Sequence, residues 1–201
     1  MKHLHRLCRA VVLSAAVLAV PAFALDVAGV KYEETAKVDG QTLKLNGAGI
    51  RHKVIFKVYT AGLYLQDKKT TVNDILEAKG VRRVQLVMLR EVSSEEFGRG
   101  FMGGIQANID KAEKIKLVNQ LLKLGELFGT IPELKKGDVL TVDWVPTVGT
   151  VMSLNGKRVI DPLPDIAFYN ALLRIWIGDK PVDANLKRAM LGEKPEERRN
   201  D

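Results

Sequence analysis

The amino-acid sequence predicts one α+β domain in which helices pack on one face of a largely antiparallel sheet. Strand patterns fill the first part of the chain, helix patterns the middle, and a strand hairpin followed by two helices completes it. This order differs from the regular alternation of strand and helix found in parallel α/β proteins. No linker rich in Pro, Gly or Ser divides the chain, and its length suffices for one good core.

The N-terminus has the pattern of a secretory signal peptide. Basic residues between Lys2 and Arg9 precede a short apolar run that closes at Ala22-Phe23-Ala24, and this pattern predicts cleavage after Ala24. The run is too short for a comfortable membrane span, and no other stretch is longer and more apolar. We therefore expect a protein exported to a bacterial periplasm, with no integral membrane segment after cleavage.

Processing divides the chain into a signal peptide at residues 1–24, a single domain at 25–192 and a charged, disordered tail at 193–201. Removing three of the 31 basic residues leaves 28 against 24 acidic ones, with His52 as the one histidine and no cysteine. A histidine-bearing metal site, a Ser-His-Asp triad and a Cys-His dyad are thereby excluded within one mature chain. The basic residues are scattered and not interleaved with aromatic ones, so we expect no nucleic-acid partner.

The first predicted elements are strands. Residues 29–40 and 41–47 surround the turn signal Asp39-Gly40 and indicate short strands. Residues 53–65 are apolar at most positions, which predicts a central strand covered on both faces. We interpret the glycine-rich stretch 46–49 as a turn that delivers Arg51 into the start of this central strand.

Helices dominate the middle of the chain. A short helix at residues 72–80 and a strand at 81–92 come first. Ser93 and Glu96 then have the spacing of a capping box, which predicts a helix over 95–109. A second helix is expected over 113–128. Its apolar residues near one face are Ile115, Val118, Leu121, Leu122 and Phe128.

The C-terminal part combines a strand hairpin with two helices. Strands are expected at residues 139–146 and within 150–160, the latter folded back at Asn155-Gly156, the strongest short hairpin signal in the chain. Helices are expected at 165–178 and 183–192. The last elements therefore return to the helical layer.

Four glycines within seven residues mark the helix over 95–109: Gly98, Gly100, Gly103 and Gly104. Each costs roughly 1 kcal/mol relative to alanine inside a helix. Such a density indicates close approach of another group. The spacing leaves two explanations open, tight packing against the sheet or a bulky ligand lying against the helix.

Phe97, Phe101 and Asn108 recur at intervals of four and seven on the same helix and therefore share a face. An amide on an apolar face must find hydrogen-bond partners. Asn108 is therefore either a satisfied core or capping amide or a ligand contact.

Arg51 is the residue that points most directly to a ligand. An arginine keeps its charge at any relevant pH, and its fork of five donors fits carboxylates, phenolates and phosphates. The alternative is a surface arginine at the start of a strand. Strand alternation sends the next residue, His52, to the opposite face.

The segment over residues 45–65 resembles the glycine-rich, arginine-bearing stretch of chalcone isomerases, which runs into a strand that ends in a Gly-hydrophobic-Tyr-Leu step. Gly62-Leu63-Tyr64-Leu65 match that step. The similarity continues in order through the helix that carries Asn108, the Lys- and Glu-rich helix after it, the hairpin and residues 168–178. The resemblance implies a chalcone isomerase-like fold with a cleft between the sheet and the helices.

In chalcone isomerases, the resemblance implies, the arginine holds the attacking phenolate of a flavonoid precursor, while other polar side chains bind the ketone and the far ring. Arg51 takes the position of that arginine, and Asn108 that of the family asparagine. Phe101 replaces the family tyrosine seven residues before the asparagine, so one hydroxyl is missing.

Two further positions depart from the family. The strand threonine falls on Tyr59, with Thr60 one step later, and the late threonine falls on Ile175, which Trp176 follows. Each lost donor removes transition-state stabilisation of about 2 to 4 kcal/mol. We therefore do not expect efficient chalcone cyclisation.

The first hypothesis is an exported protein that binds a small hydrophobic anion, of the fatty acid or aromatic acid type, with Arg51 as its anchor. Some non-enzymatic relatives in the superfamily that the chain resembles bind fatty acids through the same arginine. No metal and no cofactor are expected. The candidate ligand-binding residues are Arg51, Tyr59, Thr60, Phe97, Phe101, Ile105, Asn108, Ile175 and Trp176.

Three alternatives stay open. The first is an isomerase or intramolecular lyase of the chalcone isomerase class, in which Arg51, Tyr59 and Asn108 act on an unidentified substrate. The second is a structural or partner-binding domain in which Arg51 is a buried cap. The third is a haem-like ligand, with its propionates on Arg51 and its iron held by His52, Tyr59 or a methionine.

Overall fold

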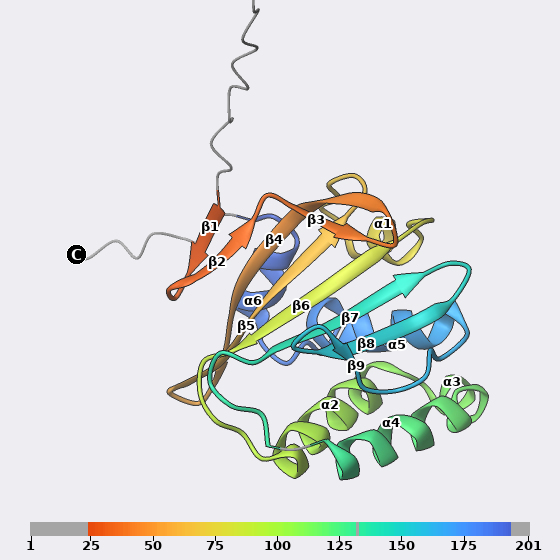
Figure 1. The fold of residues 1–201 in the computed structure, drawn as a ribbon. Helices are drawn as coiled ribbons and strands as arrows, with labels where there is room; N and C mark the ends of the chain where they lie inside the picture. Colours follow the sequence, from red (N-terminus) through yellow and green to blue (C-terminus); the bar gives the residue numbers. More distant parts are fainter. Residues whose placement is uncertain (1–23, 132, 194–201) are drawn as a thin grey trace, which may run out of the picture.

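The computed structural model describes residues 24–131 and 133–193. Almost all of the predicted signal peptide and tail lies outside the described residues. In the described part, seven strands form one antiparallel sheet in the order β3-β4-β5-β6-β7-β8-β9, so every strand pairs with its neighbour in sequence (Figure 1). The expected α+β class and the largely antiparallel sheet are confirmed.

Helices are inserted into this meander after β5 and β6 and follow its end. The strands are β1 (Ala24–Val27), β2 (Val30–Glu33), β3 (Thr35–Val38), β4 (Gln41–Lys53), β5 (Phe56–Leu65), β6 (Arg82–Met88), β7 (Val139–Val145), β8 (Gly149–Leu154) and β9 (Lys157–Arg158). The helices are α1 (Val72–Leu76), α2 (Ser94–Asn108), α3 (Lys111–Lys116), α4 (Val118–Thr130), α5 (Ile166–Ile177) and α6 (Ala184–Met190).

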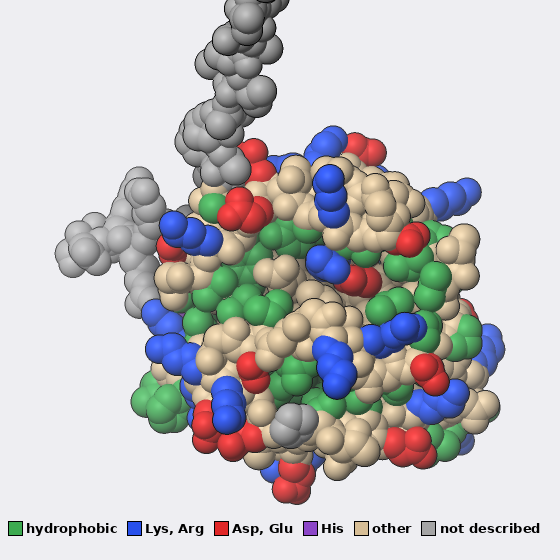
Figure 2. All heavy atoms as spheres, viewed as in Figure 1, with side chains coloured by type: hydrophobic (Ala, Val, Ile, Leu, Met, Phe, Trp, Pro, Cys, Tyr) green, Lys and Arg blue, Asp and Glu red, His purple; other side chains and the backbone are tan. Residues whose placement is uncertain are grey.

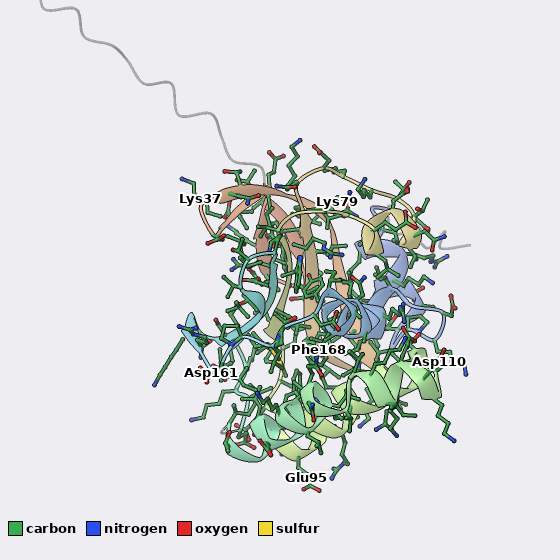
Figure 3. All side chains as sticks on the ribbon, turned by 90° about the vertical axis from the view of Figure 1, so that its right-hand side faces the viewer. Lys37, Lys79, Glu95, Asp110, Asp161 and Phe168 are labelled. Atoms are coloured by element: carbon green, nitrogen blue, oxygen red, sulfur yellow. The ribbon has the colours of Figure 1, made fainter. Side chains whose placement is uncertain are left out.

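The helices cover one face of the sheet in two layers. Helices α5 and α6 lie behind the sheet in Figure 1, and α2 and α4 pack beyond α5. Figure 3 shows Phe168 of α5 between the strands and the α2–α4 pair, whereas Glu95 of α2 points outward. Because it is enclosed in this way, α5 is apolar nearly all round, and most of its residues are buried.

The opposite face of the sheet is covered by the β1–β2 hairpin. Tyr32 of this hairpin is fully buried against Leu43, Leu45 and Tyr64. A Cβ on Gly62 in the central strand would overlap the Tyr32 ring, so the glycine allows the ring to lie flat on the sheet. The expectation of a central strand covered on both faces is therefore confirmed.

The prediction of a turn at residues 46–49 is wrong. Strand β4 continues through this stretch to Lys53, with a shift of pairing register between Leu45 and Gly47, and the chain turns at Val54-Ile55 instead. Gly47 and Gly49 are required because α6 packs directly on them: a Cβ on Gly47 would overlap the carbonyl oxygen of Ala189. The glycines permit close approach of a helix, and they do not form a turn.

The prediction of one helix over 113–128 is also wrong. Asp110 and Glu113 form a capping box that starts α3, and α4 begins as a separate helix after Leu117. The buried side chains of this region are Leu117, Leu121, Leu124, Leu127 and Phe128, whereas Ile115, Val118 and Leu122 are exposed. The predicted apolar face therefore included residues that point to solvent.

The predictions that depend on neighbouring residues, two hairpin turns and the Ser93 N-cap, are confirmed. Asp39-Gly40 and Asn155-Gly156 both adopt positive φ angles at hairpin turns, as Asx-Gly pairs do readily. The Ser93 hydroxyl caps α2 by accepting from the Glu96 backbone at 3.2 Å. In the described residues, none of the helices has both the length and the apolar character to cross a membrane.

Candidate functional site

A pocket of about 270 Å³ opens between the β4–β5 hairpin, α2 and the end of α5. It brings together five of the predicted binding residues: Arg51, Tyr59, Phe97, Phe101 and Ile175. Its further lining comes from Lys53, Val58, Val92, Glu96, Arg99, Gly100 and Val182. The pocket thus combines an apolar wall with a charged rim.

Arg51 and Tyr59 are cross-strand partners on β4 and β5. The guanidinium carbon of Arg51 lies 5.5 Å from the centre of the Tyr59 ring, within cation–π range. The Nε of Arg51 is buried and has no hydrogen-bond partner among the described residues. The side chain therefore contributes a cation to the pocket wall that no acidic residue of the described chain neutralises.

A β-bulge follows directly after Arg51, where the pairing register shifts before His52. Bulges re-aim side chains and are common beside functional sites. The backbone N–H of His52 donates to Asp183 Oδ2 at 2.9 Å, and its Nδ1 lies 3.7 Å from the same oxygen. His52 is thus engaged with the N-cap of α6 and does not line the pocket.

Tyr59 is held from behind by Trp176. The indole Nε1 donates to the Tyr59 hydroxyl at 3.0 Å, and the Trp176 ring meets Phe101 edge-on at 5.5 Å between ring centres. Burial raises the pKa of Tyr59 to about 12, against the opposing effect of the Arg51 charge. At neutral pH, Tyr59 is therefore a neutral phenol that can donate a proton but cannot act as a base.

Three phenylalanines stiffen the apolar wall. The Phe97 ring packs at a tilt against Phe101 at 5.3 Å and meets Phe128 of α4 edge-on at 5.8 Å between ring centres. Gly98 makes room for Phe128, and Gly104 makes room for Ile175 of α5, because a Cβ on either glycine would crowd these side chains. These two glycines serve the packing of helix on helix, where the sequence suggested the sheet or a ligand.

Two further glycines of α2 have open surroundings. A Cβ on Gly100 or Gly103 would meet nothing within 4 Å. Gly100 lines the pocket, and because it has no side chain, none projects into the pocket from this position. Gly103 lies on the exposed side of the helix, and its presence has no structural explanation.

Four of the predicted binding residues do not line the pocket. Thr60 lies on the opposite face of the sheet, since it neighbours Tyr59 in the strand, and its hydroxyl accepts from Tyr32 at 2.8 Å. Ile105 is fully buried in the core. Trp176 is likewise buried, behind Tyr59 and Phe101. These positions support the fold or the pocket wall and are not among the residues that line the pocket.

Asn108, the fourth predicted binding residue outside the pocket lining, connects two segments of the fold by hydrogen bonds. Its amide donates to Gly104 O at 2.9 Å and Lys180 O at 2.8 Å, and its oxygen accepts from Lys180 N at 2.9 Å. The side chain thus joins the end of α2 to the segment between α5 and α6. Its hydrogen bonds are satisfied, so Asn108 corresponds to the capping amide and not to the ligand contact.

The rim contains an ion-pair cluster that the sequence did not reveal. Glu96 binds Lys53 and Arg90, each at 3.1 Å. The hydrogen bond from Lys53 is the main cause that lowers the pKa of Glu96. The spacing to Ser93 predicts a capping box, but the Glu96 side chain binds these two cations instead of the Ser93 backbone. Lys53 lies 43 residues away, so no local signal indicates this pair.

A second hollow of about 370 Å³ lies at the other end of β5, beside α1 and Arg82. Its lining includes the polar residues Gln66, Asp67, Lys69, Asp74, Glu77 and Lys79, of which all but Lys69 are exposed. Charged residues of both signs line both pockets, but the apolar lining of this hollow is limited to Leu65, Ala78 and Val81. It therefore suits a solvated surface better than an apolar ligand.

In the two described segments, no group of three His, Cys, Asp or Glu side chains is arranged to hold a metal ion. Neither His52 nor a methionine lines the pocket, and Tyr59 is the one lining residue among the iron ligands that the haem alternative considered.

The comparisons with known proteins concern the fold and the family. A search of curated proteins finds no match. Among solved structures, the crystal structure of a fatty-acid binding protein from Arabidopsis thaliana is similar, with a TM-score of 0.64 over 81% of this chain and 92% of that chain. At 14% sequence identity, this similarity shows a shared fold. The chalcone isomerase-like family model matches residues 24–192, and the chain therefore belongs to the chalcone isomerase-like family.

Proposed function

We propose that the protein binds a small hydrophobic or amphipathic anion, of the fatty acid or aromatic acid type, with its acid group on Arg51. The observation that carries this proposal is the buried Arg51 Nε, which has no acceptor in the described chain although it lies at the wall of an apolar pocket. The structural similarity to a fatty-acid binding protein supports it.

The electrostatics of the rim favour Arg51 as the anchor. Lys53 and Arg90 are both engaged by Glu96, and Arg99 is paired with Glu95. An incoming carboxylate therefore competes with an existing acid at these cations but not at Arg51. A hydrogen bond to a charged group contributes about 1.5 to 3 kcal/mol, which is enough to orient a small ligand.

The size of the pocket limits the apolar part of the ligand. Sites for drug-sized ligands occupy roughly 300 to 1,000 Å³, and this pocket of about 270 Å³ lies just below that range. Val58, Phe97, Phe101 and Ile175 would contact the ligand through carbon atoms alone. We infer a medium-length acyl chain or a single aromatic ring as the group that fits.

The binding test uses decanoate and isothermal titration. Arg51→Met is expected to weaken decanoate binding about 10- to 100-fold, since it removes the charged donor and keeps the apolar stem. Lys53→Met is the matched control and should change the affinity by less than about threefold, because Lys53 is already paired. Equal affinity of Arg51→Met and the unmodified protein would contradict the proposal.

An enzyme of the isomerase or intramolecular lyase class is the second candidate. The observation in its favour is that Tyr59, a neutral phenol, lines the same pocket as Arg51 and could polarise a carbonyl. Asn108 is engaged elsewhere and cannot assist. Turnover of a chalcone that Tyr59→Phe abolishes would establish this function, and turnover unaffected by Tyr59→Phe would remove Tyr59 from it.

We also propose that the protein acts after export, as its N-terminal pattern indicates. The proposal is supported by the sequence of residues 1–24 alone. Expression of the full sequence should yield a protein whose first residue is Leu25 in the periplasmic fraction of a bacterial host. An uncleaved chain that stays in the cytoplasm would contradict it.

A further inference from the structure

The β4–β5 turn carries the two most exposed large hydrophobic side chains of the described structure, Val54 and Ile55, next to the exposed Phe56. Val54 is 90% exposed, Ile55 80% and Phe56 57%. Figure 2 shows a hydrophobic knob that projects from the body at the lower left, where Figure 1 has this turn. Three consecutive large apolar residues at a tip are unusual on a folded domain surface, where exposed apolar residues are normally scattered singly.

The backbone of this turn adopts a strained conformation at Val54. Val54 has φ +58°, a conformation that β-branched residues rarely adopt. Two other hairpin turns place the Asx-Gly pairs Asp39-Gly40 and Asn155-Gly156 where positive φ is needed, and the β1–β2 turn places Ala28-Gly29 there. The β4–β5 turn instead keeps an exposed valine in the strained position. Strain of this kind persists mainly at functional sites.

Cations surround the apolar tip. Lys53 and Lys57 flank it in sequence, and the Arg90 guanidinium lies 5.7 Å from the Phe56 ring. Glu96 is the acid that engages two of these three cations, so the surroundings keep a net positive charge. An apolar tip above a collar of lysine and arginine matches an anionic lipid surface, with acyl chains for the tip and headgroups for the collar.

The tip and the pocket share one hairpin. Arg51, Lys53 and Val58 line the pocket and stand on the strands that lead into and out of the turn. If the tip enters a lipid surface, the pocket mouth therefore comes to lie beside that surface. An amphipathic anion dissolved in the lipid could then reach Arg51 without crossing bulk water.

A lipid surface suits this tip better than a protein partner. A standard protein interface buries about 800 Å² on each side, which three side chains on one turn cannot supply. A membrane needs no shape complementarity, and its affinity grows with inserted apolar groups and with positive charge. We propose that the Val54-Ile55-Phe56 tip docks the protein on an anionic lipid bilayer, a role that does not depend on the ligand proposed above.

The test measures binding to vesicles by flotation. The protein is purified after export, with its first residue determined, and mixed with vesicles of phosphatidylcholine alone or with an equal share of phosphatidylglycerol. The unmodified protein should float with the anionic vesicles. The triple variant Val54→Ser, Ile55→Ser, Phe56→Ser should reduce the bound fraction at least tenfold. These side chains are exposed, so the variant should fold, which circular dichroism verifies.

A second measurement locates the contact. Ile55→Cys labelled with an environment-sensitive fluorophore should shift to shorter wavelength on anionic vesicles. Val148→Cys, at the exposed β7–β8 turn, is the matched control and should not shift.

Four results would overturn the proposal. The first two are equal binding of the triple variant and the unmodified protein, and equal binding of the unmodified protein to both kinds of vesicle. The third is a fluorescence shift at position 148 without one at position 55. The fourth is loss of binding only when the exposed residues Ile115 of α3 and Leu122 of α4 are replaced by serine. A triple variant that changes the oligomeric state without lipid would assign the tip to contacts between copies of the chain, which also overturns it.

Discussion

Two arginine–tyrosine pairs lie on the helix-covered face of the sheet, at opposite ends of β5. They differ in which of the two side chains is hydrogen-bonded. Arg82 lies over Tyr169 at 4.9 Å, and Arg51 lies over Tyr59 at 5.5 Å. In the first pair the arginine is hydrogen-bonded and the Tyr169 hydroxyl is buried without a partner in the described structure. In the second pair the tyrosine is bonded, to Trp176, and the arginine is not.

The partners of Arg82 define a structural role. It is 1% exposed, and its NH1 donates to Ile75 O at 2.9 Å and to Asn170 Oδ1 at 3.1 Å. These bonds hold the end of α1 against α5, where backbone carbonyls of a helix end favour a cation. Burial lowers the pKa of Arg82, and the ion pairs of the described residues include none between Arg82 and an acid.

The two arginines differ in their hydrogen-bond partners and in their surroundings. Both side chains have buried nitrogen atoms without an acceptor in the described residues. Arg82 lines the polar hollow beside α1 and donates to Ile75 O and Asn170 Oδ1, whereas Arg51 lies in the pocket with the larger apolar wall and its side chain makes no hydrogen bond in the described residues. Burial alone therefore does not distinguish the two arginines, and the difference in their hydrogen bonds and surroundings is what supports the proposal of Arg51 as the anchor.

The largest effect should come from removing Arg82. Arg82→Ala is expected to lower the free energy of unfolding by about 2 to 5 kcal/mol, because it leaves a core cavity and removes the hydrogen bonds from the guanidinium to Ile75 O, Leu76 O and Asn170 Oδ1. Arg51→Ala should lower it by less than about 1 kcal/mol. Denaturant unfolding of both variants measures this difference. Equal losses would mean that the two arginines do not differ in role.

Removing the hydroxyl group of each tyrosine should give a stability change of intermediate size, and the two variants form a matched pair. Tyr59→Phe should destabilise the protein by about 1 to 3 kcal/mol, because the buried Trp176 N–H loses its acceptor. Tyr169→Phe should be neutral or stabilise by up to about 1 kcal/mol, since its hydroxyl has no partner to lose in the described structure. Thermal unfolding of both variants at pH 7 compares them. A larger loss at Tyr169 would invert the comparison.

The smallest of the three effects is the alkaline sensitivity that Tyr59 adds. Burial raises the pKa of Tyr59 from 10.0 to about 12. The neutral phenol therefore contributes its full stabilisation below pH 10 and loses it as the pH rises through the folded pKa. Between pH 8 and pH 11 the unmodified protein should lose about 1.4 kcal/mol through this residue, at about 1.4 kcal/mol for each pKa unit.

The same measurement on Tyr59→Phe is the control. The free-energy gap between the two proteins should shrink by that amount over the same pH range, although other buried tyrosines destabilise both. Parallel declines of the two curves would show that Tyr59 ionises as freely in the folded state as in the unfolded state.

The sequence was sufficient wherever the physical cause is local. The Asp39-Gly40 and Asn155-Gly156 turns, the Ser93 cap and the alternation of the strands each depend on residues within four positions of one another. The family resemblance added Arg51 as a candidate anchor and the cleft between sheet and helices. The sequence therefore determined the α+β class, most of the element order and the residue on which the proposed function depends.

The tertiary structure decided what distant groups determine. Gly47 looked like a turn residue because the helix that requires it lies more than 130 residues later. Asn108 shares a helix with Phe101 but is satisfied by Lys180, and the Glu96 pair with Lys53 joins segments that no periodicity relates. Local propensity acts over a few residues, whereas close approach, hydrogen-bond satisfaction and burial depend on whichever segments the fold brings into contact.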